Sequence, residues 1–78
     1  MMTIETFAIL KDYFEPKFQI SETPTNINQL QEHLLRLNPR AATLLSMSRF
    51  AVNDTFIDQH YQLQANDVIS IIPPSSGG

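Results

Sequence analysis

The end of the chain reads VISIIPPSSGG, residues 68–78. Residues 68–72 form a nearly continuous apolar run, which is typical of a strand in the middle of a sheet with both faces covered. Pro73 and Pro74 follow at once, and proline fixes φ at about −65° and supplies no backbone N–H, so the chain cannot continue as a paired strand. We therefore predict a central strand that leads directly into a stiff, extended projection.

The only two glycines of the sequence are Gly77 and Gly78. Because glycine has no Cβ, they form the thinnest and most freely turning backbone that a chain can offer to a narrow channel. From Pro73 the tail spans at most ~20 Å when extended, enough to carry a terminal carboxylate well into a partner protein. We predict a folded domain over residues 1–72 followed by an extended, flexible tail; the alternative is an ordinary frayed terminus. The tail comprises Pro73, Pro74, Ser75, Ser76, Gly77 and Gly78.

The composition limits what the chain can do. It has 78 residues, a net charge of −3 and no cysteine. A domain of this length buries only ~60–65% of its unfolded surface, which leaves little room for an internal active site. Without cysteine there is no disulfide, thiolate metal site or cysteine nucleophile, and five scattered Lys and Arg residues argue against binding to nucleic acid or an anionic membrane. We find no transmembrane-length apolar run and no export leader, so we expect a cytoplasmic protein.

The first part of the chain predicts a hairpin. Residues 2–10 are strand-like, with Ile4 and Ala8 on one face and Glu5 and Phe7 on the other. A short helical turn or loop over residues 11–15 ends at Pro16. Residues 17–21 alternate polar with apolar side chains, which predicts a second strand.

One clear helix follows. Asn26 is its predicted N-cap, with Gln29 reaching back toward the first turn. The apolar stripe that should cover the sheet consists of Ile27, Leu30, Leu34 and Leu37. Asn38 and Pro39 end this helix, and Pro39 can begin a second short helix that reaches about Met47 and buries Leu44 or Leu45.

The rest of the chain predicts three strands. Residues 49–52 and 55–57 should form a hairpin around Asn53 and Asp54, which tolerate unusual φ angles, before the strand at residues 68–72. The order of elements predicts an α+β fold: a mixed sheet of four to five strands packed on one main helix plus a short second helix. Because a long helical crossover separates the hairpins, we expect the first and last strands to be parallel neighbours.

Several motifs coincide with those of a known family. They are Phe7-Ala8 followed by Lys11-Asp12, the capped helix with Leu30, the Val52-Asn53 turn, the spacing from Leu63 to Asp67-Val68, and Ile72-Pro73-Pro74 with Gly77-Gly78. The chain resembles the small sulfur-carrier subunit of molybdopterin synthase, the MoaD-like branch of the ubiquitin-like β-grasp proteins, over nearly its whole length. Two departures are Lys11-Asp12, where the family often has Arg-Glu, and Asn66, where it has glycine. Both are mild, because charge signs are kept and asparagine tolerates left-handed φ.

The resemblance implies a carrier in molybdenum cofactor biosynthesis rather than a catalyst. An adenylating enzyme of the ubiquitin-activating type would use ATP and magnesium to adenylate the Gly78 carboxylate, and a sulfur donor would convert the product to a thiocarboxylate. The tail would then enter the large subunit of molybdopterin synthase, in a heterotetramer, and give its sulfur to a cyclic pterin phosphate. The chain itself would bind no cofactor.

Other functions remain open. The thiazole-forming sulfur carrier of thiamine synthesis has the same fold and ending, but its members are typically shorter and lack the two prolines. A ubiquitin-like modifier would also use an adenylated Gly78. In a free-standing enzyme, His33 or His60 could act as a base near the carboxylates of Glu32, Asp58 or Asp67. Against this, His33 falls on the polar helix face, His60 falls in a polar loop, no nucleophile stands at a fixed spacing, and no metal site is predicted.

The alternation of side chains along the predicted strands also indicates where partners bind. Phe7 shares the face of Glu5, Ile72 faces away from the helix if Ile69 and Ile71 meet it, and Phe56 belongs to the same open side. Exposed apolar groups of this kind mark protein interfaces. We predict that Phe7, Phe56 and Ile72, with Lys11 as a rim charge, form one docking surface for both the activating enzyme and the large synthase subunit.

Overall fold

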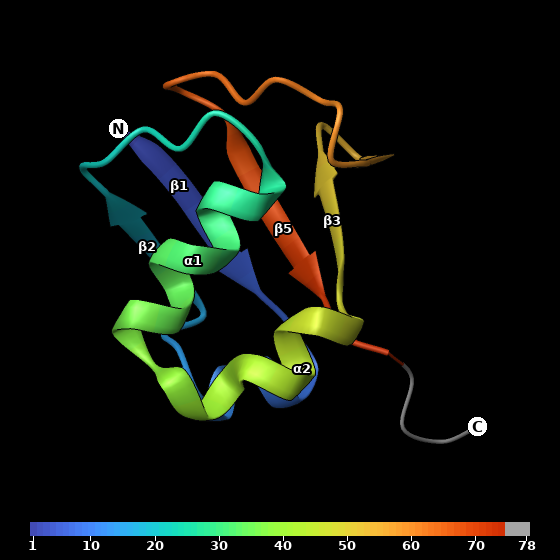
Figure 1. Cartoon of the computed structure of the whole chain (residues 1–78). Coiled ribbons are helices and arrows are strands. Elements are labelled where there is room, and N and C mark those ends of the chain that lie inside the picture. The colour runs from blue at the N-terminus through green and yellow to red at the C-terminus, as the bar shows by residue number, and fades with distance from the viewer. Residues whose placement is uncertain (75–78) are drawn as a thin grey trace.

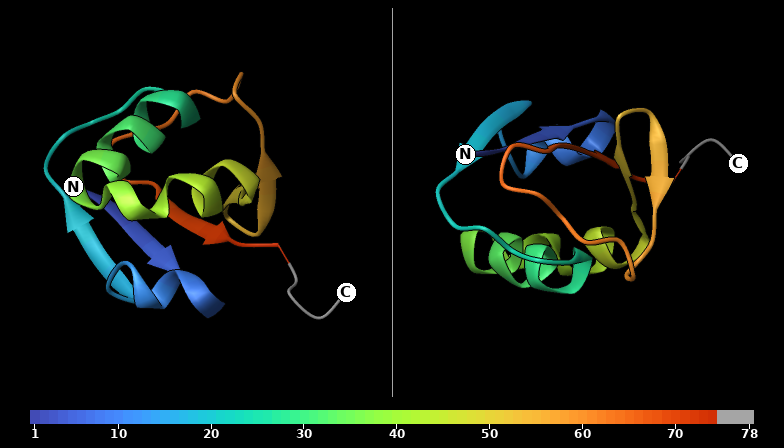
Figure 2. Two further views of the ribbon diagram at one scale, coloured as in Figure 1. Left: turned by 60° about the horizontal axis from the view of Figure 1, so that its bottom comes forward. Right: turned by 90° about the horizontal axis from the view of Figure 1, so that it is seen from above.

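Residues 1–74 are described by the computed structural model. The strands are β1 (Met2–Thr6), β2 (Lys17–Ile20), β3 (Arg49–Val52), β4 (Thr55–Ile57) and β5 (Val68–Ile72). The helical segments are η1 (Ala8–Asp12), α1 (Ile27–Leu37), η2 (Pro39–Ala41) and α2 (Ala42–Met47), where η marks a 3-10 helix. The strands form a single sheet in the order β2-β1-β5-β3-β4, and α1 and α2 form a second layer on one of its faces (Figure 1, Figure 2). This is the predicted α+β fold with a mixed sheet.

The central position of β5 confirms the prediction made from its apolar sequence. It lies between β1, to which it is parallel, and β3, to which it is antiparallel. Ile69 and Ile71 are fully buried in the core beneath the helices. Val68, Ser70 and Ile72 alternate with them on the opposite face and remain at least partly exposed. The sheet therefore has one covered face and one open face at the strand that leads to the tail. The expectation that both faces of this strand are covered is wrong, because the helices cover only the face of Ile69 and Ile71.

The start of α1 is capped as predicted. The Asn26 side-chain oxygen accepts a hydrogen bond from the backbone N–H of Gln29 at 2.9 Å. Gln29 reaches back in turn, and its Oε1 accepts a bond from the backbone N–H of Thr25 at 2.9 Å. These bonds satisfy donors that a helix start leaves without an intrahelical partner.

The apolar stripe of α1 is shorter than predicted. Ile27, Leu30 and Leu34 are buried, but the prediction that Leu37 is also buried is wrong, because Leu37 is 56% exposed. Leu37 is the last residue of the helix and lines an open groove beside Phe14, so only part of its side chain is covered. The core therefore ends before the helix does.

The second helix forms where Pro39 predicts it. Asn38 accepts a hydrogen bond from the backbone N–H of Arg40 through its side chain at 3.2 Å, and Pro39 occupies the first turn of η2. Of the two candidate leucines, Leu45 is buried and Leu44 is partly buried against the core.

The hairpin of β3 and β4 is also confirmed. Asn53 and Asp54 both have positive φ angles, of 52° and 62°, as a two-residue hairpin turn with the right twist requires. The turn fixes a register in which Phe56 lies opposite Ala51. Phe56 is thereby placed on the open face of the sheet.

The prediction of one strand over residues 2–10 is wrong after Thr6, where β1 ends. Ala8 has a φ of 53°, in the left-handed region, and the chain turns there into η1. Ala8 is therefore exposed instead of sharing the buried face of Ile4. Leu10 is fully buried, but it reaches the core from the 3-10 helix. A short apolar run has too few residues for its periodicity to separate these two structures.

The hairpin of β1 and β2 is confirmed, with shifted boundaries. Thr6 at its closed end is buried, and its backbone N–H and its hydroxyl donate to the carbonyls of Pro16 and Glu15, each at 2.9 Å. The helical turn predicted for residues 11–15 begins earlier, as η1, and β2 ends at Ile20, one residue before the predicted end.

Replacing Ala8 with glycine should raise the free energy of unfolding by up to ~1 kcal/mol. A left-handed conformation costs a residue with a Cβ roughly 1–2 kcal/mol, and the larger backbone entropy of glycine in the unfolded chain offsets part of the gain. Urea unfolding followed by circular dichroism measures the change. Ala42, with a φ of −54°, is the control, because the same substitution there should lower stability by ~0.5–1 kcal/mol. A loss of stability at both positions would contradict strain at Ala8.

Candidate functional site

Two rows of side chains cross the open face of the sheet near the end of β5. By the strand register, the first row runs across Glu5, Ser70, Ala51 and Phe56. In the second row, Ile72 is the partner of Arg49. Phe7 follows β1 with an extended backbone, φ −131° and ψ 156°, which keeps it on the face of Glu5. The rows bring residues from four segments of the chain to the place where β5 ends.

An open hollow of about 400 Å³ lies on this part of the sheet. It is lined by Phe7, Ala51, Asp54, Phe56, Ser70 and Ile72. Phe7 and Phe56 are 43% and 49% exposed, whereas Ala51 is only 6% exposed. The structure thus places Phe7, Phe56 and Ile72, which the sequence analysis selected as partner-binding residues, around one hollow. Two half-exposed aromatic rings above a small residue leave a recess that an apolar side chain of a partner can fill.

Lys11, the fourth predicted interface residue, lies in η1 and is exposed. It does not line the hollow. Its role as a rim charge stays a prediction.

The root of the tail adjoins this hollow. Pro73 is buried and Pro74 is exposed, so the packed body includes the first proline after β5. The predicted tail residues Ser75, Ser76 and Gly77, and the predicted sulfur-carrying terminus Gly78, lie outside the described residues.

One contact on the open face was missed by the sequence analysis. The guanidinium carbon of Arg49 lies 3.6 Å from the centroid of the Phe56 ring. A cation over an aromatic face is attracted by the ring quadrupole, by ~0.5–1 kcal/mol at exposed sites. The signal was present in the sequence, because the turn at Asn53-Asp54 sets the hairpin register and puts Arg49 and Phe56 on the same face.

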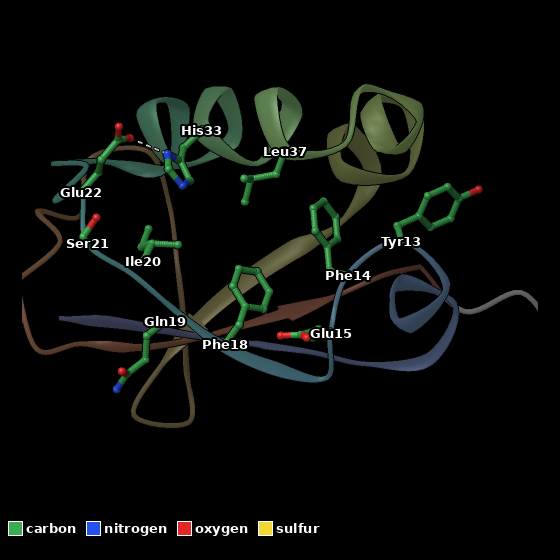
Figure 3. Close-up of a pocket in the computed structure, with 10 residues that line it drawn as sticks. All are labelled: Tyr13, Phe14, Glu15, Phe18, Gln19, Ile20, Ser21, Glu22, His33 and Leu37. Atoms are coloured by element: carbon green, nitrogen blue, oxygen red, sulfur yellow. Dashed lines mark hydrogen bonds and ion pairs between the residues drawn. The ribbon is translucent and has the colours of Figure 1, made fainter.

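A second groove lies between α1 and β2, far from the tail in the chain. Figure 3 shows Phe14, Phe18 and Leu37 directed into it from the β1–β2 connection, β2 and α1. The Phe14 and Phe18 rings are stacked with centroids 6.1 Å apart. At one end, Nδ1 of His33 lies 2.5 Å from a carboxylate oxygen of Glu22 (Figure 3). The groove thus has apolar side chains in its middle and the His33–Glu22 pair at one end, and Glu15, Gln19 and Ser21 also line it.

The prediction that the His33 side chain lies on the wet face of its helix is wrong, because only 15% of that side chain is exposed. Glu22, which also approaches Arg36 at 3.6 Å, ties the segment before α1 to the helix. His60 is exposed, and its backbone N–H donates to the Asp58 side chain at 2.9 Å. Within residues 1–74 neither histidine ring has a hydrogen bond to a hydroxyl group.

Within residues 1–74, no group of three or more His, Asp or Glu side chains is placed to hold a metal ion. None of the helices in this part of the chain is long and apolar enough to cross a membrane.

Comparisons with known proteins agree with the geometry. The model of the ThiS family matches residues 4–78. The molybdopterin synthase sulfur carrier subunit of Dictyostelium discoideum is 39% identical over 56 residues, which cover 69% of this chain and 64% of that protein. The chain thus spans less than two thirds of the length of this curated relative.

Solved structures show the same fold. A complex of subunits 1 and 2 of the molybdopterin-converting factor from Helicobacter pylori contains a chain that is 28% identical, with a TM-score of 0.70 and coverage of 99% of this chain and 97% of that one. SAMP1 from Haloferax volcanii has a TM-score of 0.75 and coverage of 99% and 98%, and at 16% identity it shows the fold alone. The predicted ubiquitin-like β-grasp fold and the resemblance to the small sulfur-carrier subunit are confirmed.

Proposed function

Because the chain belongs to the ThiS family, we propose that it is a sulfur carrier in molybdenum cofactor biosynthesis, and the non-catalytic small subunit of a molybdopterin synthase. The curated relative supports this proposal, because it is a molybdopterin synthase sulfur carrier subunit. The large synthase subunit is the proposed partner that accepts the sulfur, in a heterotetramer, and an adenylating enzyme of the ubiquitin-activating type is the partner that loads it.

The proposed chemistry takes place at the Gly78 carboxylate. In the adenylating enzyme, which supplies ATP and magnesium, a carboxylate oxygen attacks the α-phosphate and pyrophosphate leaves. The persulfide of a sulfur donor then attacks the acyl carbon and AMP leaves. A thiol cleaves the resulting acyl disulfide, so the terminus becomes a thiocarboxylate and the donor sulfur forms a disulfide with that thiol. In the large synthase subunit the thiocarboxylate gives its sulfur to a cyclic pterin phosphate, and two such transfers make one dithiolene. The chain contributes the terminus and a docking surface, and both enzymes contribute the catalytic groups.

The observation that carries the proposal is the position of the hollow. Phe7, Phe56 and Ile72 line it, and Ile72 is the last residue of the strand that leads to the tail. In a partner that covers the hollow, the tail therefore starts from a fixed position next to the bound surface. If both partners use this hollow, they bind one at a time, and the carrier must leave the activating enzyme before it enters the synthase.

Intact-mass measurement of the protein isolated from its own cells tests the proposal. We expect a species heavier by one oxygen-to-sulfur exchange, with fragmentation that places the sulfur at Gly78. Treatment with an alkylating reagent should shift that species selectively, because the thiocarboxylate is a nucleophile and the chain has no cysteine. A terminus found only as an isopeptide bond to lysines of other proteins would instead indicate a protein modifier.

Single changes of Phe7, Phe56 and Ile72 to alanine should each weaken binding to the large synthase subunit and to the activating enzyme by at least ~1–2 kcal/mol. Truncating an anchor residue in the centre of an interface removes contacts that the surrounding residues cannot replace. Calorimetric titration of each partner measures the loss.

Val68→Ala is the matched control, because Val68 is on the open face of β5 and 42% exposed but does not line the hollow. It should leave both affinities nearly unchanged. Unchanged binding of both partners by all three hollow variants would refute the shared docking surface.

A further inference from the structure

Arg49 is a charged side chain beside the hollow that the proposed function does not use. It is opposite Ile72 in the register, and its guanidinium is held over the ring of Phe56. Both neighbours line the hollow. In Figure 1, β3 lies beside β5 where that strand approaches the tail. Arg49 is therefore at the edge of the surface that a docked partner would cover.

The positive charge of Arg49 has no carboxylate partner within residues 1–74. The ion pairs in that part of the chain join Lys17 to Glu5, and His33 and Arg36 to Glu22. On the open face, Glu5 is thus engaged by Lys17 at 3.8 Å. Asp54 lines the hollow but makes no ion pair with Arg49. The open face presents a fixed cation beside an apolar recess.

Docking would remove this cation from water. Arginine stays charged in proteins, and a charge that is buried without a partner is strongly destabilising. A bound surface must therefore offer Arg49 an acceptor, and a carboxylate fits best because it can take two parallel hydrogen bonds from the guanidinium. Stacking on Phe56 restricts the Arg49 side chain before binding, so less entropy is lost when that pair forms.

Asp54 makes the charge distribution around the hollow asymmetric. A carboxylate that approached from the Asp54 side of the hollow would meet a like charge. We propose that Arg49 is a specificity-determining residue, and that the large synthase subunit docks with an apolar side chain in the hollow and an Asp or Glu carboxylate against Arg49. This inference rests on the proposed function, since it names the surface chemistry of that same partner.

The test measures binding of the large synthase subunit to the full chain at low and at physiological salt. Arg49→Met keeps an unbranched apolar side chain over Phe56 but removes the charge, and it should weaken binding ~10-fold at low salt and reduce the salt dependence. Arg49→Glu should weaken it by ~100-fold or more, because it places two carboxylates together. The control is Arg40→Met, which removes the same charge from an exposed position in the helix layer and should change binding less than ~2-fold.

A second variant, Arg49→Lys, keeps the positive charge. It provides the test if Arg49→Met lowers the melting temperature. It should bind more weakly than the natural chain and retain most of the salt dependence. Binding of Arg49→Met or Arg49→Lys with the affinity and salt dependence of the natural chain would overturn the inference and leave the proposed function standing. Failure of the natural chain itself to bind the large subunit would overturn the proposed function and the inference together.

Discussion

Replacing Gly77 with valine is expected to abolish thiocarboxylate formation at Gly78 while leaving the fold intact. In the proposed activation, the Gly78 carboxylate would present an oxygen in line with the α-phosphate of ATP, and the acyl-adenylate would then admit a bulky sulfur donor. A β-branched side chain one residue away would crowd both steps and restrict the backbone that must enter a narrow channel. Activation is reconstituted with the adenylating enzyme. Release of pyrophosphate measures adenylation, and the intact mass of the chain measures sulfur transfer.

Ser75→Val is the matched control for this change. It introduces the same side chain in the same tail, but farther from the reacting carboxylate, and should retain most of the activation. Deleting Gly78 should be as damaging as Gly77→Val, and all three variants should unfold within ~0.5 kcal/mol of the natural chain. A large fall in melting temperature on removing Gly77 and Gly78 would mean that the tail packs on its own domain. That result would contradict the prediction of an extended, flexible tail.

The elements that the sequence predicts well are those with a local chemical signal. Asn26 accepts the bond expected of an N-cap, and Asn53-Asp54 adopts the positive φ angles expected of a hairpin turn. The apolar run at residues 68–72 indicates a central strand, and β5 is the central strand, although only one of its faces is covered. In each case a few adjacent residues determine the local structure, so no knowledge of distant contacts is needed.

The errors arise where a distant contact decides the outcome. Whether residues 7–10 extend β1 or form a 3-10 helix depends on how Leu10 reaches the core, and the run is apolar in either case. Leu37 fits the helical period of the stripe, but it lies at the end of α1 beside an open groove and is 56% exposed. His33 fits the polar face, yet Glu22 in the preceding segment draws it into a pair.

The candidate site was predictable in part for the same reasons. Strand alternation places Phe7, Phe56 and Ile72 on the open face, and the structure gathers them around one hollow. These three side chains meet because of the strand order, which places β1 on one side of β5 and the hairpin of β3 and β4 on the other. The stacking of Arg49 on Phe56 required the hairpin register as well as the face.

Replacing Ile69 with alanine should lower the free energy of unfolding by ~2–5 kcal/mol, a large share of the ~5–15 kcal/mol that holds a small domain together. The side chain is fully buried at the centre of β5, in the cluster that includes Leu30 and Leu34 of α1. Its removal loses apolar burial and leaves a cavity between sheet and helix that the paired strands on either side cannot close. Leu30→Ala should have a similar effect from the helix side.

The adjacent residue on the same strand isolates this effect from changes in strand propensity. Val68 is on the open face and 42% exposed, so Val68→Ala should cost less than ~1 kcal/mol, because little burial is lost and no cavity forms. Chemical denaturation of Ile69→Ala, Leu30→Ala and Val68→Ala measures all three changes on one scale. Ile69→Ala and Val68→Ala could lower the free energy of unfolding equally, or Ile69→Ala could lower it by less than ~1 kcal/mol. Either result would mean that the helices do not cover the face on which β5 carries Ile69 and Ile71. The open face would then no longer be the one that carries Ile72, and the docking surface beside the tail would lose its basis.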